Sequence, residues 1–182
     1  YHALLKLPHV LRQGNWKVTV AIWMGREILD IKPGKINDLY GLAIDVGTTT
    51  VAGYLCQLRT GEIVATESMM NPQVIYGEDV MSRITYVMTH PEDGLEKLQQ
   101  SIIGGLNRLI KTITERGNLL AEDVLELVIV GNTAMHHLLL KINPEYLGVS
   151  PFPPAIHESI DVRSRDLGLK THPSANVHVL PI

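Results

Sequence analysis

The sequence predicts a mixed α/β domain preceded by a small β-hairpin unit. Three apolar strand patterns, separated by short turns, fill residues 42–70, and two amphipathic helix patterns follow in residues 78–117. A further buried strand pattern then ends at Gly131 and runs directly into another helix pattern. The order predicted from residue 41 onward is therefore three strands, two helices, a strand, a helix and a final strand, in a mixed sheet.

The composition is that of an ordinary globular protein. Of the 182 residues, 45% are hydrophobic and 19% are charged, and the formal net charge is −3. This balance provides no general attraction for nucleic acid or for an anionic membrane surface. No apolar run approaches the roughly 18 residues that a membrane span needs. We therefore expect neither nucleic acid nor a membrane among the partners.

A single cysteine, Cys56, limits the chemistry that this chain can carry by itself. It cannot form an internal disulfide, and one thiol cannot provide the four thiolates of an ordinary iron–sulfur cluster. A lone thiol in an apolar strand pattern is typical of a small core residue in a reducing compartment, so we expect a cytoplasmic location. The chain opens on Tyr1 and ends in the strand pattern NVHVLPI, and we expect it to be a piece of a longer protein.

Residues 1–40 differ in pattern from the rest of the chain. A short helical piece ends at Gly14, and two strands come after it, joined around Gly25 and closed by the turn Pro33-Gly34. Alternate apolar residues in the first strand share one face, as the two-residue period of a strand requires. We predict that residues 1–40 form a linker unit and that residues 41–182 form a separate domain.

The domain is predicted to open with three consecutive strands, LAIDV, TVAGYLCQL and EIVATESMM, which tight turns join in antiparallel order. The first is a continuous apolar run, which predicts that the carboxylate of Asp45 is buried. The first helix pattern comes next, with Glu78 and Asp79 in its first turn, where the helix dipole favours anions. Arg83 lies one turn after Asp79, and this spacing predicts an intrahelical ion pair.

The second helix pattern has leucine and isoleucine at three- and four-residue steps and stops at Gly117. Gly104 and Gly105 lie inside it. Because each glycine costs of order 1 kcal/mol in a helix interior relative to alanine, the pair predicts close packing at this point.

The segment DVGTTT, Asp45 to Thr50, is the main candidate site. Its residues are Asp45, Val46, Gly47, Thr48, Thr49 and Thr50. A glycine turn between strands lets successive amides converge on an anion, threonine hydroxyls add donors, and a carboxylate at the strand end suits Mg²⁺ held through water. The alternative is a plain hairpin, with threonines that favour β structure and Asp45 capping the turn.

A second candidate lies where the strand LELVIVG meets the next helix. Gly131, Asn132 and Thr133 stand at a helix start, where amides are free to bind an anion. Here too the alternative is structural, with Asn132 or Thr133 acting only as the helix cap. His136 and His137 are adjacent on this helix and point about 100° apart, so they cannot chelate one ion together, and we expect no structural metal.

These motifs resemble two known groups. The aspartate-x-glycine-threonine-threonine turn resembles the first phosphate loop of the ASKHA superfamily, which joins acetate and sugar kinases, heat-shock chaperone ATPases and actin. The stretches YGLAIDVGTTTVAGYL, NPQVIYGEDVMSRI and VIVGNTAMHHLLL, in this order, are similar to the middle region of the RACo family. WKVTVAIWMGREILDIKPG is similar to the linker segment of that family.

The resemblance implies an ASKHA (actin-like, ribonuclease H-like) half-unit after a linker. Members of the RACo family are ATP-dependent reductive activators of corrinoid proteins, in which a ferredoxin-like domain with a two-iron, two-sulfur cluster precedes the linker and a two-part ASKHA unit. They use ATP to help deliver an electron to cob(II)alamin and so restore cob(I)alamin. This chain would be the linker and the first half of the ASKHA unit, with the cluster in the parent protein. The implied partners are a corrinoid protein, the remaining parts of the parent and a second copy in a homodimer.

The resemblance also implies roles for individual residues. Asp45 would face Mg²⁺ bound with ATP, and Gly47, Thr48, Thr49 and Thr50 would form the phosphate loop. Gly131, Asn132 and Thr133 would line the nucleotide cleft. Glu78 and Asp79 would line it as well and help to position metal or water, although ordinary helix-start carboxylates remain the alternative. We expect this fragment alone not to be catalytically competent.

Two other functions remain open. One is a small-molecule kinase of the ASKHA superfamily, which would need a catalytic carboxylate, nominally Glu78 or Asp79, and an acceptor pocket. The other is a non-catalytic dimerisation or docking module whose threonine loop is vestigial and no longer binds a ligand.

Overall fold

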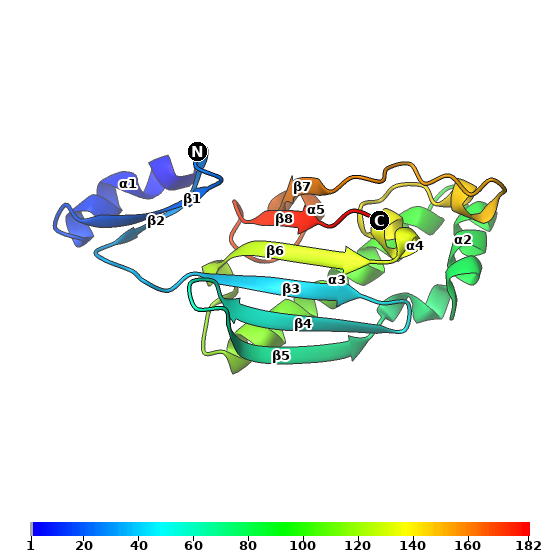
Figure 1. The fold of residues 1–182 in the computed structure, drawn as a ribbon, viewed down its shortest axis with the longest axis horizontal. Coiled ribbons are helices and arrows are strands. Elements are labelled where there is room, and N and C mark those ends of the chain that lie inside the picture. The colour runs from blue at the N-terminus through cyan, green and yellow to red at the C-terminus, as the bar shows by residue number, and fades with distance from the viewer. Residues whose placement is uncertain (1) are drawn as a thin grey trace.

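The computed structural model describes residues 2–182. Its first part is a helix packed on a two-stranded antiparallel hairpin, and a short connection joins this unit to the larger sheet (Figure 1). The bounds are α1 (His2–Gln13), β1 (Val18–Trp23) and β2 (Glu27–Pro33). The helix and hairpin expected in this region are present. Among residues 2–182, no helix has the length and apolar character of a membrane span.

The larger part is built on a six-stranded mixed sheet in the order β5-β4-β3-β6-β8-β7. The strands are β3 (Tyr40–Val46), β4 (Thr50–Gln57), β5 (Glu62–Met70), β6 (Val124–Gly131), β7 (Ile160–Arg163) and β8 (Asn176–Val179). Strands β3, β6 and β8 are parallel, whereas β4, β5 and β7 run antiparallel to their neighbours. The chain first forms three antiparallel strands, β3, β4 and β5, and the parallel strands β6 and β8 then extend the sheet on the other side of β3. This is the expected actin-like, ribonuclease H-like half-unit.

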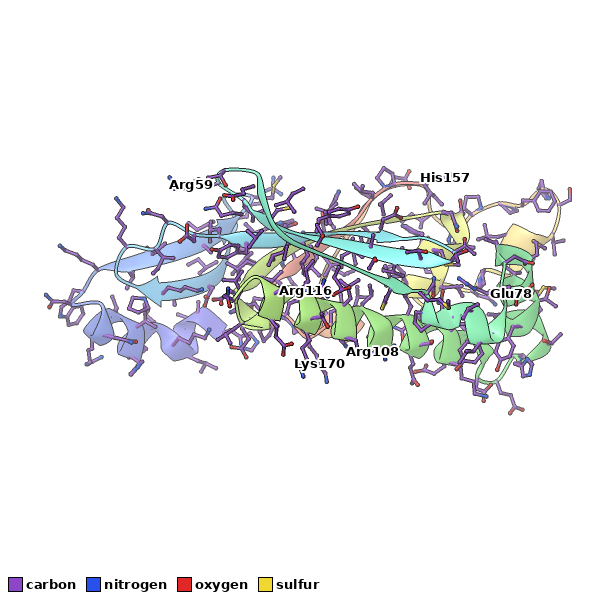
Figure 2. The ribbon with its side chains drawn as sticks, turned by 90° about the horizontal axis from the view of Figure 1, so that it is seen from below. Arg59, Glu78, Arg108, Arg116, His157 and Lys170 are labelled. Carbon is purple, nitrogen blue, oxygen red and sulfur yellow. The ribbon has the colours of Figure 1, made fainter. Side chains whose placement is uncertain are left out.

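Among residues 2–182, helices cover only one face of this sheet. Figure 1 shows α3 lying behind the strands, and Figure 2, turned by 90°, shows the helices on one side and the strands on the other. The helices are α2 (Val80–Thr89), α3 (Gly94–Arg116), α4 (Thr133–Leu139) and α5 (Ser164–Leu167), with short 3-10 turns η1 (Pro72–Tyr76), η2 (Ala121–Asp123) and η3 (Glu145–Gly148). α3 packs across β4 and β5, and its fully buried residues, Leu98, Leu106, Ile110 and Ile113 among them, form the core.

The opposite face of the sheet carries no helix from the described part of the chain, and this overturns one expectation. Along β3 the side chains alternate, so that Leu42, Ile44 and Val46 are buried against the helices while Ala43 and Asp45 are exposed. Asp45 was expected to be buried because its strand is a continuous apolar run. Because successive side chains of a strand point to opposite faces, its carboxylate instead lies on the uncovered face.

The structure also adds elements that the sequence patterns do not predict. Between α4 and β8 the chain forms β7 and the single-turn helix α5. β7 is a four-residue edge strand, IDVR, in which apolar and charged residues alternate for only two periods, too short a run to stand out in the sequence. Among the described residues β7 pairs only with β8. Its strand conformation therefore depends on this pairing rather than on its own sequence pattern.

Candidate phosphate-binding site

The turn between β3 and β4 is closed by its own backbone. The Gly47 amide donates to the Thr50 carbonyl over 3.0 Å. A Cβ atom at Gly47 would lie only 2.5 Å from that carbonyl oxygen, a distance that no side chain tolerates without moving the turn. Glycine is therefore required for this closure.

The carbonyls of three successive loop residues are each held by a group from outside the loop. Asn71 donates twice, from its side-chain nitrogen to the Gly47 carbonyl at 2.8 Å and from its backbone amide to the Thr49 carbonyl at 2.8 Å. Arg83 donates from Nη2 to the Thr48 carbonyl at 2.6 Å. Both donors are fully buried, so the loop is fastened from the protein interior.

This fastening fixes the direction of the loop amides. A trans peptide is planar, and its N–H points away from its C=O. When the Gly47 and Thr48 carbonyls are held inward, the amides of Thr48 and Thr49 point outward. Within residues 2–182, neither amide donates a hydrogen bond. Two adjacent free amides of this kind form a concave donor pair that suits an anion.

The start of α4 lies against the same loop. The Asn132 side chain donates from Nδ2 to the Thr48 hydroxyl at 2.9 Å, and its Oδ1 accepts from the Met135 amide at 3.0 Å. Asn132 is thus the N-cap of α4, with Thr133 as the first helical residue. A Cβ at Gly131 would lie 3.0 Å from the Val46 carbonyl oxygen, so glycine lets β6 end close beside the loop. The structure therefore brings the two sequence-predicted segments together.

Asp45 stands next to this loop on the uncovered face of the sheet. It lies opposite Ala52 of β4 and Val130 of β6 in the strand register. Its carboxylate has no hydrogen bond or ion pair with any described residue. A free carboxylate beside outward-facing amides matches the preference of Mg²⁺ for hard oxygen ligands and retained water.

Glu78 and Asp79 lie at the start of α2, at the same end of the molecule as the loop (Figures 1 and 2). Asp79 accepts from the Ser82 amide at 2.7 Å and from the Ser82 hydroxyl at 2.8 Å, and these bonds hold the pKa of its carboxyl below the ordinary value. Asp79 is thus the N-cap of α2, as the structural alternative expects. Glu78 is exposed and makes no hydrogen bond or ion pair with any residue in the described part of the chain.

Arg83 does not form the surface ion pair that its spacing from Asp79 predicts. Its side chain is 0% exposed, and its donors reach the Thr48 carbonyl, the Gly77 carbonyl at 2.9 Å and the Gln73 side-chain oxygen at 3.3 Å. Burial lowers the pKa of its guanidinium, and the charge of Asp79 partly offsets this effect. No carboxylate of the described chain forms an ion pair with it.

Sequence reasoning missed Asn71, Gln73 and Arg83 as supports of the loop. Asn71 caps η1, and its Oδ1 accepts from the Gln73 amide at 2.9 Å. The signal that was available is the pair Asn71-Pro72, which is typical of a capped helical turn. Nothing local indicates that the other end of the Asn71 side chain reaches Gly47.

A hollow of about 370 Å³ opens beside the start of α4. Its lining is mostly apolar, and Asn132 and Thr133 at the helix start are its two polar residues. The apolar lining residues are Val80, Ile84, Ala134, Leu147 and Phe152. A mostly apolar hollow with a few polar groups is typical of a small-molecule site. It is contiguous with the loop through Asn132.

Comparison with known proteins places the chain in a family. The model of the RACo middle region matches residues 40–182, and the model of the RACo linker region matches residues 1–38. The chain belongs to the RACo family. Among curated proteins, this RACo-family chain is 34% identical over 160 residues to "Corrinoid activation enzyme RamQ" of Eubacterium limosum, covering 87% of the chain and 27% of RamQ.

The RACo-family chain also matches a solved structure described as "Reductive activator for corrinoid, iron-sulfur protein". The identity is 36%, the TM-score is 0.86, and the match covers 100% of the chain and 29% of that structure. The chain therefore spans less than a third of the length of either relative. The fold of the corresponding part is shared throughout, linker unit included.

Proposed function

We propose that this chain is the linker and the first nucleotide-binding half of an ATP-dependent activator that returns the cob(II)alamin of a corrinoid protein to cob(I)alamin. The observation that carries the proposal is the match of the whole chain, in fold and sequence, to a protein described as a reductive activator for a corrinoid, iron–sulfur protein. In this assignment residues 1–40 are the linker and residues 41–182 are the ASKHA half-unit.

The role of this chain is to hold the phosphates of ATP. The outward amides of Thr48 and Thr49 donate to phosphate oxygens, and the hydroxyls of the exposed Thr49 and Thr50 add further donors. Asp45 holds Mg²⁺ through water, and the metal neutralises phosphate charge when bound. Gly131, Asn132 and Thr133 form the adjoining wall of the cleft, with Glu78 and Asp79 at its rim.

The reduction itself needs groups outside this chain. One electron converts cob(II)alamin to cob(I)alamin, and a two-iron, two-sulfur cluster in the ferredoxin-like part of the parent protein would supply it. ATP binding favours a closed arrangement of the two ASKHA halves, and this arrangement changes how the protein holds its corrinoid partner. We infer a homodimer in the cytoplasm as the working form, and we assign no complete reaction to this chain alone.

The test uses the full-length protein and a purified corrinoid protein held as cob(II)alamin, with a low-potential chemical reductant. Loss of the cob(II)alamin absorbance is followed with and without Mg·ATP. We expect Mg·ATP to accelerate the loss, and Asp45→Asn to reduce the ATP-dependent rate by about tenfold or more. Glu92→Gln, an exposed carboxylate outside the site, is the matched control and should behave as the wild type. An absorbance change that Mg·ATP does not accelerate would contradict the proposal.

A further inference from the structure

The feature that the proposed function leaves unexplained is the Arg83 guanidinium. A buried guanidinium is ordinarily paired with a carboxylate, because an unpaired charge in the interior is costly. Arg83 is 0% exposed, yet all three of its oxygen acceptors are neutral, and no carboxylate of residues 2–182 pairs with it. The fold therefore retains a positive charge directly behind the loop.

The three nitrogens of the guanidinium donate to oxygen acceptors on three different segments, and Nη1 also donates to the Met135 sulfur of α4 at 3.1 Å. Nε donates to the Gly77 carbonyl before α2, Nη1 to the Gln73 side chain in η1, and Nη2 to the Thr48 carbonyl. The planar fork of arginine makes this arrangement possible, whereas the single ammonium of lysine cannot reach all three acceptors with the same geometry. Arg83 thus couples the position of the loop to the start of α2.

The contact with Thr48 has an electrical consequence. The Thr48 carbonyl points at the guanidinium, and the Thr49 amide on the same peptide points the opposite way. The positive charge on one side of this peptide polarises it, so that the amide on the other side becomes a stronger donor. A phosphate oxygen bound at the Thr49 amide would lie in line with this peptide and with the guanidinium behind it.

We propose that Arg83 is the positioning residue for phosphate: it holds the Thr48 carbonyl inward, turns the Thr49 amide toward the ligand, and supplies from behind the loop a positive charge that favours a polyanionic ligand. This inference rests on the proposed ATP site and deepens it. Arg83 itself does not touch the ligand. It acts through the peptide between Thr48 and Thr49.

The test compares two ligands that differ in the triphosphate and the Mg²⁺ bound to it. Affinities of the full-length protein for Mg·ATP and for adenosine are measured by calorimetry in the wild type, Arg83→Met, Arg83→Lys and Arg108→Met. Methionine keeps much of the side-chain length without the charge or the donors. Arg108 is an exposed arginine of α3 that points away from the sheet (Figure 2), so its variant is the matched control.

We expect Arg83→Met to weaken ATP binding by about tenfold or more, the effect of losing a charge-assisted hydrogen bond, and to leave adenosine binding unchanged. Arg83→Lys should lie between Arg83→Met and the wild type, because it restores charge without the fork. Unchanged ATP affinity in Arg83→Met, or an equal loss for ATP and adenosine, would overturn the positioning role.

If Arg83→Met does not fold, as judged by circular dichroism, Arg83→Lys decides the question by the same comparison. A selective loss of ATP affinity in Arg83→Lys supports the proposal, and wild-type affinity overturns it. Equal affinity of the wild-type protein for ATP and adenosine is a different outcome, because it contradicts the phosphate site itself rather than the part that Arg83 plays in it.

Discussion

Two adjacent histidines of α4 differ sharply in their hydrogen bonding. The Ala155 amide donates to Nε2 of His137 at 3.0 Å, so Nδ1 of His137 carries the proton and donates to the Thr133 carbonyl at 2.8 Å. His136 is 2% exposed, and neither of its ring nitrogens has a partner in the described part of the chain. Both rings are thus buried in their neutral form.

Burial lowers the pKa of both His136 and His137 below the usual value of 6.5. Below that value the unfolded chain binds more protons than the folded one, so the free energy of unfolding should fall as the pH is lowered from about 7 to about 5.5. Urea unfolding at several pH values measures this, and His136→Leu should reduce the slope. A stability that stays constant or rises on acidification over this range would contradict the prediction.

The residue types in the loop between β3 and β4 indicate its function from the sequence, whereas the buried side chains that hold the loop in place could not be predicted. Gly47 and the threonines indicate a turn suited to an anion from composition alone. Arg83 was misassigned because its spacing from Asp79 matches that of an ordinary surface pair, and only the packing of α2 against the loop shows that the side chain turns inward. Asp45 was misassigned because an apolar run does not reveal which face of a sheet lacks a covering layer.

Within α3, the two neighbouring glycines have different surroundings. A Cβ at Gly105 would lie 2.8 Å from atoms of Met69 and Pro72, whereas at Gly104 the nearest atom outside the helix backbone, from the Arg108 side chain, is 3.9 Å away. The close packing predicted from the glycine pair is therefore confirmed for Gly105 and wrong for Gly104. The helical pattern alone could not tell them apart, because the difference depends on where β5 and η1 approach the helix.

These surroundings predict opposite effects for the same substitution. Gly104→Ala should raise the free energy of unfolding by about 0.5–1 kcal/mol, since alanine is the better helix former and meets open space. Gly105→Ala should lower it by about 1–3 kcal/mol, because the added methyl group collides with Pro72. Urea unfolding of the two variants in parallel tests this, each serving as the control for the other, and changes of the same sign would contradict it.

The linker unit is attached to the rest of the molecule through ionic contacts. Asp30 of β2, 4% exposed, lies 3.4 Å from the His172 ring of the larger part and 3.1 Å from the ammonium of Lys6, which belongs to the linker unit itself. Lys32 pairs with Asp123 at 2.7 Å, and Glu27 pairs with Arg163. Spacing along the chain predicts none of these, because each joins residues far apart in sequence. The hairpin could be predicted from its local sequence pattern, whereas its attachment depends on residues that only the complete fold brings next to it.

Burial raises the pKa of Asp30, but hydrogen bonds from His172, Lys6 and the Ile31 amide together outweigh it and bring the value down from 3.8 to about 2. The stabilisation that the ionised Asp30 carboxylate provides is therefore present at pH values above 3.8, and it is lost as the pH falls toward about 2. Asp30→Asn should lower the free energy of unfolding by about 2 kcal/mol at neutral pH, and the deficit should shrink on acidification.

Asp166→Asn, which alters an exposed carboxylate, is the matched control. Chemical unfolding at neutral pH and at about pH 3 provides the comparison. An Asp30→Asn variant as stable as the wild type at neutral pH would show that the Asp30 cluster does not hold the linker unit in place.

The central claim is that the loop between β3 and β4 binds the phosphates of ATP with Mg²⁺ at Asp45. The most direct measurement is calorimetric titration of the full-length protein with Mg·ATP in the wild type, Asp45→Ala and Thr49→Ala. We predict that the wild type binds and that Asp45→Ala weakens binding by about tenfold or more, with a smaller loss for Thr49→Ala, which keeps its amide. Equal affinity in all three forms would contradict the assignment of the phosphate loop.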